Sequence, residues 1–295
     1  MHIDLSELTD GFSSKLKVIS FFLAVIKIKK LKKKLYIYEK KTKESPYLFT
    51  DHCLIKNFKL IKIKKKPRTK IVFNPYNYDS KLKELKSTNF IDQKKGKKFN
   101  LIADSSYRNF IPNKKTQKKV SKINLPKNFI GIHIRSTDRV VNIKNFIKKI
   151  QFKEMIFDYQ IKNMVKNINN FIKLKSKINN IFICSDDKLL KNFFLTELQK
   201  KYNVYFNQSR FQKQKFRQTN GIDFISELFC LSRSKIIIST VGGAVTNTAY
   251  LISKKKIRIY KWTNILNIFF FCKIIVLIIF FSKKLKNSFI KYFFV

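Results

Sequence analysis

Short runs of β-branched and aromatic residues alternate with helix-length segments over residues 128–260, and this alternation constrains the fold more than any other feature. The expected strands are residues 129–135, 181–184, 204–206, 236–239 and 257–260. The expected helices are residues 146–174, 188–200, 222–231 and 244–252. Strands that alternate with helices form parallel sheets covered by helices on both faces. The sequence therefore predicts an α/β fold for this half of the chain.

The N-terminal part shows the start of a similar unit. Residues 1–8 and 35–38 are expected strands on either side of an apolar helix over residues 18–28, which is typical of a βαβ unit. Residues 101–103 are a further candidate strand, and the polar stretch 113–121 is the best candidate linker. We therefore expect two Rossmann-like lobes with parallel sheets and a cleft between them.

The expected organisation is an N-terminal lobe over residues 1–120, a C-terminal lobe over residues 121–262 and a tail over residues 263–295. Residues 265–281 of the tail are almost entirely apolar, at the lower limit of about 17–25 residues for a membrane span. Lys273 at mid-depth would cost about 2.5–3.5 kcal/mol. Three interpretations stay open: a membrane-associated anchor, a closing helix buried on the other lobe, or a frame-shifted end.

The formal net charge of +46 suggests attraction to phosphate backbones. However, only eight of the 64 basic residues are arginine, and Gly and Pro number only six and five. A genome biased toward A/T-rich codons would give this composition to a protein of almost any fold. Aromatic residues are spread along the chain without a cluster for base stacking. A basic nucleic-acid-binding protein is kept as an alternative function, and no specific nucleic acid is expected as a partner.

The four cysteines are widely spaced and form no C-x-x-C pair, which argues against a disulfide scaffold and a cysteine-based zinc site and fits a reducing compartment. Acidic residues precede the apolar run 17–28, where a signal peptide would carry basic ones. The expected location is the cytoplasm. Through its apolar tail and its positive charge, the protein could associate with an anionic membrane surface.

The segment 131–139, Gly-Ile-His-Ile-Arg-Ser-Thr-Asp-Arg, carries the strongest chemical signal. Strand alternation places Gly131, His133 and Arg135 on one face. Ligands of open α/β sheets bind beyond the carboxyl ends of the strands. A histidine and an arginine there suit an anionic ligand, because the Arg135 guanidinium can bind two phosphate oxygens. The alternative is a strand-end ion pair between Arg135 and Asp138.

Two later segments add polar groups after expected strands. Asp186 and Asp187 follow the strand 181–184, and Ser185 or Asp186 can cap the next helix, which leaves the other acidic group available. Glu227 lies four residues after Asp223 on a helix. Gly242 and Gly243 open the following helix, where paired glycines let the backbone approach a phosphate. An ordinary tight turn is the alternative for these glycines, and neither the dinucleotide nor the Walker pattern occurs.

Together these segments resemble the fucosyltransferase-like GT-B glycosyltransferases. Residues 10–16, Asp-Gly-Phe-Ser-Ser-Lys-Leu, resemble the opening glycine loop of that family. Residues 131–139 resemble the first motif of α-1,6-fucosyltransferases and nodulation fucosyltransferases, residues 182–190 the second, and residues 227–250 the third. The order and spacing agree over about residues 8–260.

The resemblance implies a GT-B-like α/β fold in which the N-terminal lobe faces the acceptor and the C-terminal lobe binds the nucleotide sugar. It implies an inverting, metal-independent transfer of a sugar, fucose by the resemblance, from a GDP-sugar to a glycan or lipid-linked acceptor. No cofactor is implied besides this donor substrate. A diphosphate leaving group requires cationic and backbone donors that stabilise its developing negative charge.

The resemblance places His133 at the guanosine part, Arg135 at the diphosphate and Glu227 at the guanine edge. The implied nucleotide-sugar-binding residues are His133, Arg135, Arg139, Asp186, Asp187, Glu227, Gly242, Gly243 and Gly11. The candidate catalytic residues are Arg135 and Asp138. Asp138 is the candidate base for the acceptor hydroxyl, and its alternative role is to orient Arg135.

Three positions depart from the family pattern. Ser136 stands where a second arginine is common, Gly242 and Gly243 stand where the family has a serine pair, and residues 140–143 lack an acidic residue. These departures bear on fucose specificity more than on the superfamily. An inactive, degraded glycosyltransferase copy is kept as a second alternative.

Overall fold

The computed structural model describes residues 2–6, 11–41, 47–66, 93–134, 165–166, 168–173, 176–209, 219–239 and 244–261. Several predicted features lie outside this part of the chain. They are Arg135, Asp138, Arg139, the paired glycines 242–243, the tail 263–295 and most of the expected helix 146–174.

A five-stranded parallel sheet forms the C-terminal half. Its strands are β6 (Ile130–Ile134), β7 (Asn180–Ser185), β8 (Asn203–Phe206), β9 (Ile236–Ser239) and β10 (Arg258–Lys261). Their order is β10-β9-β6-β7-β8, and every neighbouring pair is parallel. The predicted strands of this half are therefore confirmed to within one residue at each end.

Helices cover both faces of this sheet, which explains why all of β6 is buried. Ile130, Ile132 and Ile134 pack in one core cluster with side chains of α7 (Lys188–Gln199). The opposite face meets α8 (Gly221–Leu231), and α9 (Ala244–Ile252) contacts β6 there through Thr246 and His133. A Cβ added to Gly131 would lie 2.7 Å from Leu231 Cδ2, so this glycine lets α8 approach β6 closely.

The N-terminal half is built on a smaller parallel sheet. Its strands are β1 (His2–Asp4), β2 (Lys34–Tyr38) and β4 (Lys59–Lys62), in the order β1-β2-β4. Helix α1 (Phe12–Ile28) connects β1 to β2, which confirms the expected βαβ unit. A separate pair, β3 (Cys53–Ile55) and β5 (Phe110–Pro112), is antiparallel.

Two expectations for the N-terminal half are wrong. Residues 101–103 belong to helix α3 (Gln93–Ser106), which is followed by the 3₁₀ helix η2 (Tyr107–Asn109). The expected linker 113–121 is helix α4 (Lys114–Lys122). Its N-cap, Asn113, accepts a hydrogen bond from the Thr116 backbone N–H at 2.9 Å. The expected lobe boundary at residue 120 falls within α4, and the division into lobes stays a prediction.

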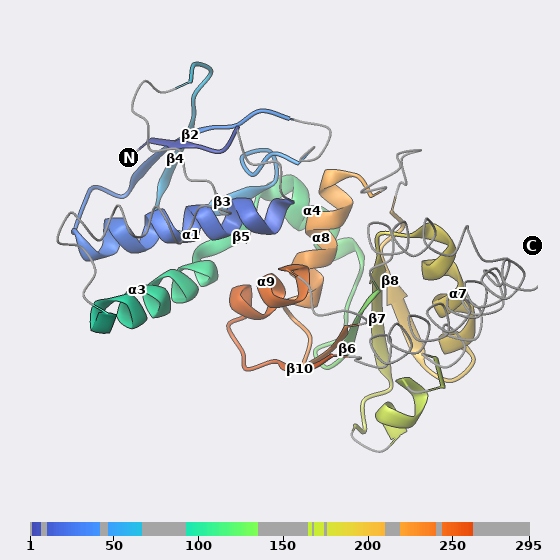
Figure 1. Ribbon diagram of the computed structural model, residues 1–295. Helices are drawn as coiled ribbons and strands as arrows, with labels where there is room; N and C mark the ends of the chain where they lie inside the picture. The colour runs from blue at the N-terminus through green and yellow to red at the C-terminus, as the bar shows by residue number, and fades with distance from the viewer. Residues whose placement is uncertain are drawn as a thin grey trace, which may run out of the picture.

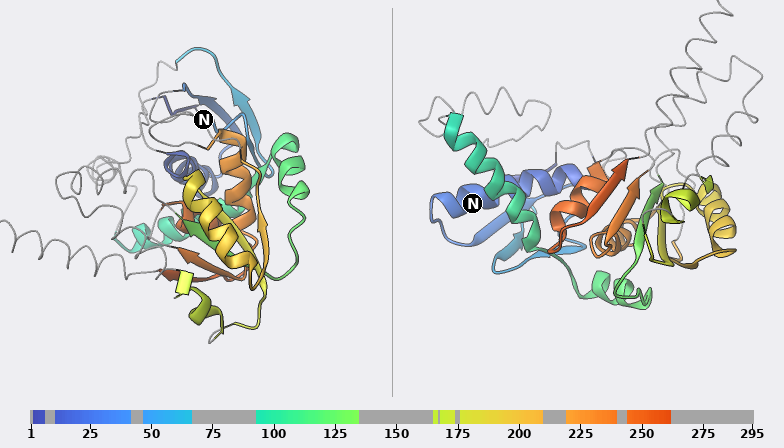
Figure 2. Two further views of the ribbon diagram at one scale, coloured as in Figure 1. Left: turned by 90° about the vertical axis from the view of Figure 1, so that its right-hand side faces the viewer. Right: turned by 90° about the horizontal axis from the view of Figure 1, so that it is seen from below.

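One continuous apolar core joins the two halves. Phe12 of α1, Phe49, Leu228 of α8 and Ile237 of β9 belong to the same cluster of buried side chains. Helices α8 and α9 lie between the N-terminal elements and the five-stranded sheet (Figure 1). Seen from below, α1 and α3 lie at one end of the molecule and α7 at the other (Figure 2). None of the helices within the described ranges is long and apolar enough to cross a membrane.

Candidate functional site

The direction in which successive strands are added to the five-stranded sheet reverses between β6 and β9. The chain leaves β6 toward β7 and β8 on one side, whereas β9 and β10 extend the sheet on the other. His133 of β6 pairs in register with Ser239 of β9, so the two strands end side by side. The segments that carry Arg135 and the paired glycines therefore begin at neighbouring strand ends. Such a switch point is the usual ligand position in open α/β sheets.

His133 lies at this edge and contacts the hydroxyl group of Thr246, which in turn contacts that of Ser239. Its Nδ1 atom is 3.1 Å from Thr246 Oγ1 of α9, and Thr246 Oγ1 donates to Ser239 Oγ at 3.0 Å. His133 is 6% exposed, and Thr246 and Ser239 are completely buried. The expected placement of Gly131 and His133 on the face opposite the isoleucines is confirmed.

Asp187, rather than Ser185 or Asp186, caps helix α7. The Asp187 side chain accepts a hydrogen bond from the Leu190 backbone N–H at 3.1 Å. Ser185 Oγ in turn accepts from the Asp187 backbone N–H at 3.1 Å. The interpretation in which Ser185 or Asp186 is the cap is therefore wrong, because the chain turns into the helix one residue later. Asp186 is half-buried just beyond the end of β7, the strand next to β6.

Substitution of Asp187 and substitution of Asp186 should change the stability of the protein by different amounts. Asp187→Ala removes the acceptor for the Leu190 N–H and is expected to lower the free energy of unfolding by about 1 kcal/mol. Asp186→Ala, the matched control at the neighbouring position, should cost less. Urea unfolding of both variants measures the difference. A larger loss for Asp186→Ala would contradict the capping assignment.

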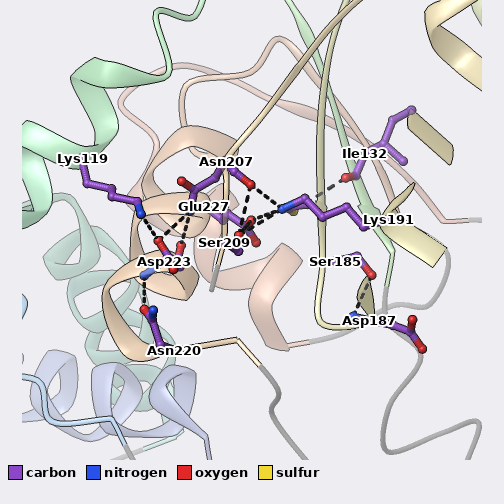
Figure 3. A network of polar contacts seen from close by, with 11 residues as sticks. Lys119, Ile132, Ser185, Asp187, Lys191, Asn207, Ser209, Asn220, Asp223 and Glu227 are labelled. Carbon is purple, nitrogen blue, oxygen red and sulfur yellow. Dashed lines mark hydrogen bonds and ion pairs between the residues drawn. The ribbon is translucent and has the colours of Figure 1, made fainter. Parts of the chain in front are cut away.

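Glu227 is buried in a polar network at the β8 side of the sheet (Figure 3). Glu227 is 4% exposed and forms an ion pair of 2.6 Å with Lys191, which is 2% exposed. Ser209 Oγ donates to the same carboxylate oxygen at 2.8 Å. Lys191 also donates to the Asn207 backbone carbonyl at 2.9 Å. Burial raises the pKa of Glu227, and the Lys191 charge opposes this increase.

A second ion pair continues the network toward the N-terminal half. The completely buried carboxylate of Asp223 on α8 pairs with Lys119 of α4. Asn207 Nδ2 donates to Asp223 Oδ1 at 3.2 Å, so it links Asp223 to the segment held by Lys191. The side chain of Asn220 caps α8 by accepting from the Asp223 backbone N–H at 3.0 Å. Residues of α4, α7 and α8 are thus joined by one set of polar contacts.

Sequence reasoning missed Lys119, Lys191 and Asn207. A signal existed for Lys191, because it lies between Leu190 and Phe194 on the apolar face of an expected helix. A lysine at such a position needs an anionic partner. The partner, Glu227, lies 36 residues away along the chain, and helical periodicity does not reveal such pairs.

Gly11 is the N-cap residue of α1 and has extended backbone angles, with φ of −65°. Phe12 follows it and packs edge-on against Phe224 of α8, with ring centroids 6.3 Å apart. Lys15 in the first turn is completely buried and donates to the Tyr47 backbone carbonyl at 2.5 Å. The start of α1 is therefore fixed against α8. Over the described ranges no group of three or more His, Cys, Asp or Glu residues could hold a metal ion.

Solved structures with a similar fold include fucosyltransferases. The crystal structure of NodZ α-1,6-fucosyltransferase soaked with GDP-fucose matches with a TM-score of 0.50 and 12% identity, over 85% of this chain and 92% of that chain. Fucosyltransferase NodZ from Bradyrhizobium matches with a TM-score of 0.49 and 12% identity, over 85% and 93%. POFUT1 in complex with GDP-fucose gives a TM-score of 0.35 and 9% identity, over 54% and 49%. The chain thus spans about half the length of POFUT1.

No protein-family model matches the sequence, and no curated protein matches it. At 12% identity, the likeness to NodZ shows the fold. The chain has a GT-B-like α/β fold, as the parallel sheets and their strand order also indicate.

Proposed function

We propose that this protein is a glycosyltransferase that moves a sugar, with fucose as the first candidate, from a GDP-sugar donor to a hydroxyl group of a glycan or lipid-linked acceptor. The observation that carries the proposal is the in-register pairing of His133 and Ser239 at the switch point of the sheet. From these strand ends start the two segments whose residue types suit a diphosphate. The fold shared with NodZ, a protein solved with GDP-fucose, supports the same donor class.

In this proposal Arg135, Arg139 and the N-terminus of α9 stabilise the departing diphosphate. The acceptor oxygen attacks the anomeric carbon while the bond from that carbon to the diphosphate oxygen breaks, which inverts the configuration. Asp138 takes the proton from the acceptor hydroxyl. Cationic side chains and backbone N–H groups offset the charge on the leaving group, so the proposed reaction needs no metal ion.

The remaining proposed donor contacts come from residues near the same edge. His133 meets the guanosine part, and Asp186 follows the neighbouring strand β7. Gly11 is proposed to face the donor from the N-terminal half. Glu227 is proposed on the guanine side, where Lys191 and Ser209 hold one oxygen of its carboxylate. Asp187 also caps α7, so its proposed role is combined with a structural one.

A donor screen by thermal shift tests the proposal directly. GDP and GDP-fucose should raise the melting temperature, because a ligand at 100 times its Kd adds about 2.7 kcal/mol of stability. UDP- and CMP-sugars should have no comparable effect. Release of GDP from GDP-fucose with an acceptor mixture then measures turnover. No shift with any GDP compound would overturn the proposal, and a shift without turnover would identify an inactive copy.

The nucleic-acid alternative gives a different result in the same preparation. It predicts RNA binding that weakens steeply with salt and is unchanged by His133→Ala and Arg135→Ala. The glycosyltransferase proposal instead predicts that both variants bind GDP more weakly than the wild-type protein.

A further inference from the structure

Helix α1 runs into a short basic segment that is exposed along its whole length. Residues 27–33, Lys-Ile-Lys-Lys-Leu-Lys-Lys, include five lysines, and all seven residues are exposed. We call this segment the basic turn. No acidic residue stands between Asp10 and Glu39 in the sequence. One or two lysines are enough to interact with the negative end of a helix dipole, so the stability of α1 does not account for five.

Backbone hydrogen bonds hold the basic turn in one conformation. The Leu31 N–H donates to the Ile26 carbonyl at 3.0 Å, and Lys30 has a positive φ of 52°. These are the features of a Schellman motif, which usually has glycine at the position of Lys30. The Lys59 N–H also donates to the Lys33 carbonyl at 3.0 Å, which ties the turn to the start of β4. The side chains of the turn therefore project from a defined surface.

Two side chains of the basic turn are large and apolar. Ile28 is 44% exposed and Leu31 is 43% exposed. Single exposed apolar side chains are ordinary, but these two are three positions apart and every other residue of the turn is a lysine. A lysine keeps its ammonium group in water while its stem lies along apolar surface. This combination suits the boundary between anionic headgroups and acyl chains in a membrane.

The basic turn lies at the end of α1 that is away from the candidate donor site. Helix α1 starts where Phe12 packs against Phe224 of α8, and it ends at Ile28, at the end of the molecule away from the five-stranded sheet (Figures 1 and 2). A helix of this length spans about 25 Å. A surface bound to the turn would therefore contact the N-terminal half.

We propose that the basic turn docks the protein on an anionic phospholipid membrane, with its lysines against the headgroups and with Ile28 and Leu31 inserted between them. A nucleic-acid backbone also attracts lysines, but it offers no apolar layer to Ile28 and Leu31. The turn contains no aromatic residue for base stacking. A membrane thus accounts for both kinds of side chain. The docking goes beyond the proposed function and holds whether or not the protein transfers a sugar.

Co-sedimentation of the full chain with vesicles tests the proposal. Vesicles of phosphatidylcholine and phosphatidylserine should bind the protein more tightly than vesicles of phosphatidylcholine alone. The charge variant replaces four lysines of the turn: Lys29→Gln, Lys30→Gln, Lys32→Gln and Lys33→Gln. Its affinity for the anionic vesicles should fall by about tenfold or more, because each lysine at such a surface contributes roughly a factor of five.

The matched control removes the same charge from helix α4. It replaces four exposed lysines: Lys114→Gln, Lys115→Gln, Lys118→Gln and Lys122→Gln. Its affinity for the anionic vesicles should change by no more than about twofold, since charges that lie farther than a Debye length from the membrane are largely screened. Equal losses in the two variants would show a general effect of net charge and would overturn the proposal.

The apolar variant Ile28→Gln/Leu31→Gln distinguishes a membrane from a nucleic acid. It keeps all five lysines, yet its affinity for the anionic vesicles should fall about tenfold, because two apolar side chains no longer enter the bilayer. Its affinity for single-stranded RNA should equal that of the wild-type protein. The substituted residues are all exposed, so the melting temperatures should stay close to the wild-type value. Unchanged vesicle binding in the apolar variant would overturn the proposal.

Discussion

Replacing Lys191 with methionine is expected to lower the free energy of unfolding by about 3–5 kcal/mol, the usual cost of removing one partner of a buried ion pair. The variant keeps the length and apolar character of the side chain but leaves the Glu227 carboxylate without its cation. It also removes the donor that holds the Asn207 carbonyl. For a chain of this size the melting temperature should fall by roughly 10 °C. Urea unfolding and calorimetry measure the two quantities.

Lys200→Met on the same helix is the matched control. Lys200 forms an ion pair of 2.6 Å with Glu197, but the two side chains are 60% and 34% exposed. Its loss should change the free energy by no more than about 0.5 kcal/mol. The double variant Lys191→Met/Glu227→Gln removes both buried charges and should recover most of the stability. Equal losses in Lys191→Met and Lys200→Met would contradict the assigned role of the buried pair.

The loss in the free energy of unfolding that Lys191→Met causes should also depend on pH. Burial raises the pKa of Glu227 above the ordinary value of 4.5, and loss of the Lys191 charge raises it further. A carboxyl group with a raised pKa in the folded state binds its proton more tightly there than in the unfolded chain. Its favourable contribution is therefore complete below the ordinary value and is lost as the pH rises through the raised one. The difference between variant and wild type should shrink as the pH falls from neutral toward 4.5.

Replacing Arg135 with alanine is expected to lower kcat for transfer from the GDP-sugar about 10²–10³-fold, the usual loss when one donor to a developing anion is removed. A guanidinium beyond the end of β6 can bind two phosphate oxygens at once. Its positive charge stabilises the diphosphate most strongly as the diphosphate leaves and its negative charge develops. Arg135→Lys should recover only part of the rate, because an ammonium group cannot form the paired contact. Initial rates with saturating donor measure the effect.

Arg108→Ala is the control for a general loss of charge. Arg108 is exposed in η2 of the N-terminal half, and its removal changes the net charge by the same amount. Its kcat should stay within twofold of the wild-type value, an expectation based on the small effect of exposed substitutions, about 0.5 kcal/mol. Similar rates in Arg135→Ala and wild type would remove Arg135 from the proposed reaction.

The C-terminal sheet could be predicted from the sequence because its signals are local. Isoleucine-rich strands and their helical spacers determine β6 to β10, and alternation along β6 separates the isoleucines from Gly131 and His133. The sequence of helix α4 looks like a linker because most of its residues are lysine or another polar type. Only Thr116 and Val120 face the interior there, so the apolar pattern is too sparse to indicate a helix.

The polar network could not be predicted, since its pairs depend on how helices pack. The resemblance implies that Glu227 contacts the donor, but it says nothing of Lys191, the partner of Glu227 on another helix. The Lys119–Asp223 pair likewise joins α4 to α8 across a long stretch of sequence. The contacts that link His133 to Thr246 and Thr246 to Ser239 depend on the register of β6 against β9. No sequence pattern reveals that register.

Photo-crosslinking with an azido derivative of GDP, followed by mass spectrometry of the labelled peptides, tests the binding position most directly. We predict that the label lies on residues 131–139 or 240–250, the segments at the carboxyl ends of β6 and β9, and that unlabelled GDP prevents it. Label spread over the lysine-rich surface, such as α4, that unlabelled GDP does not prevent would contradict a GDP-sugar site at this edge of the sheet.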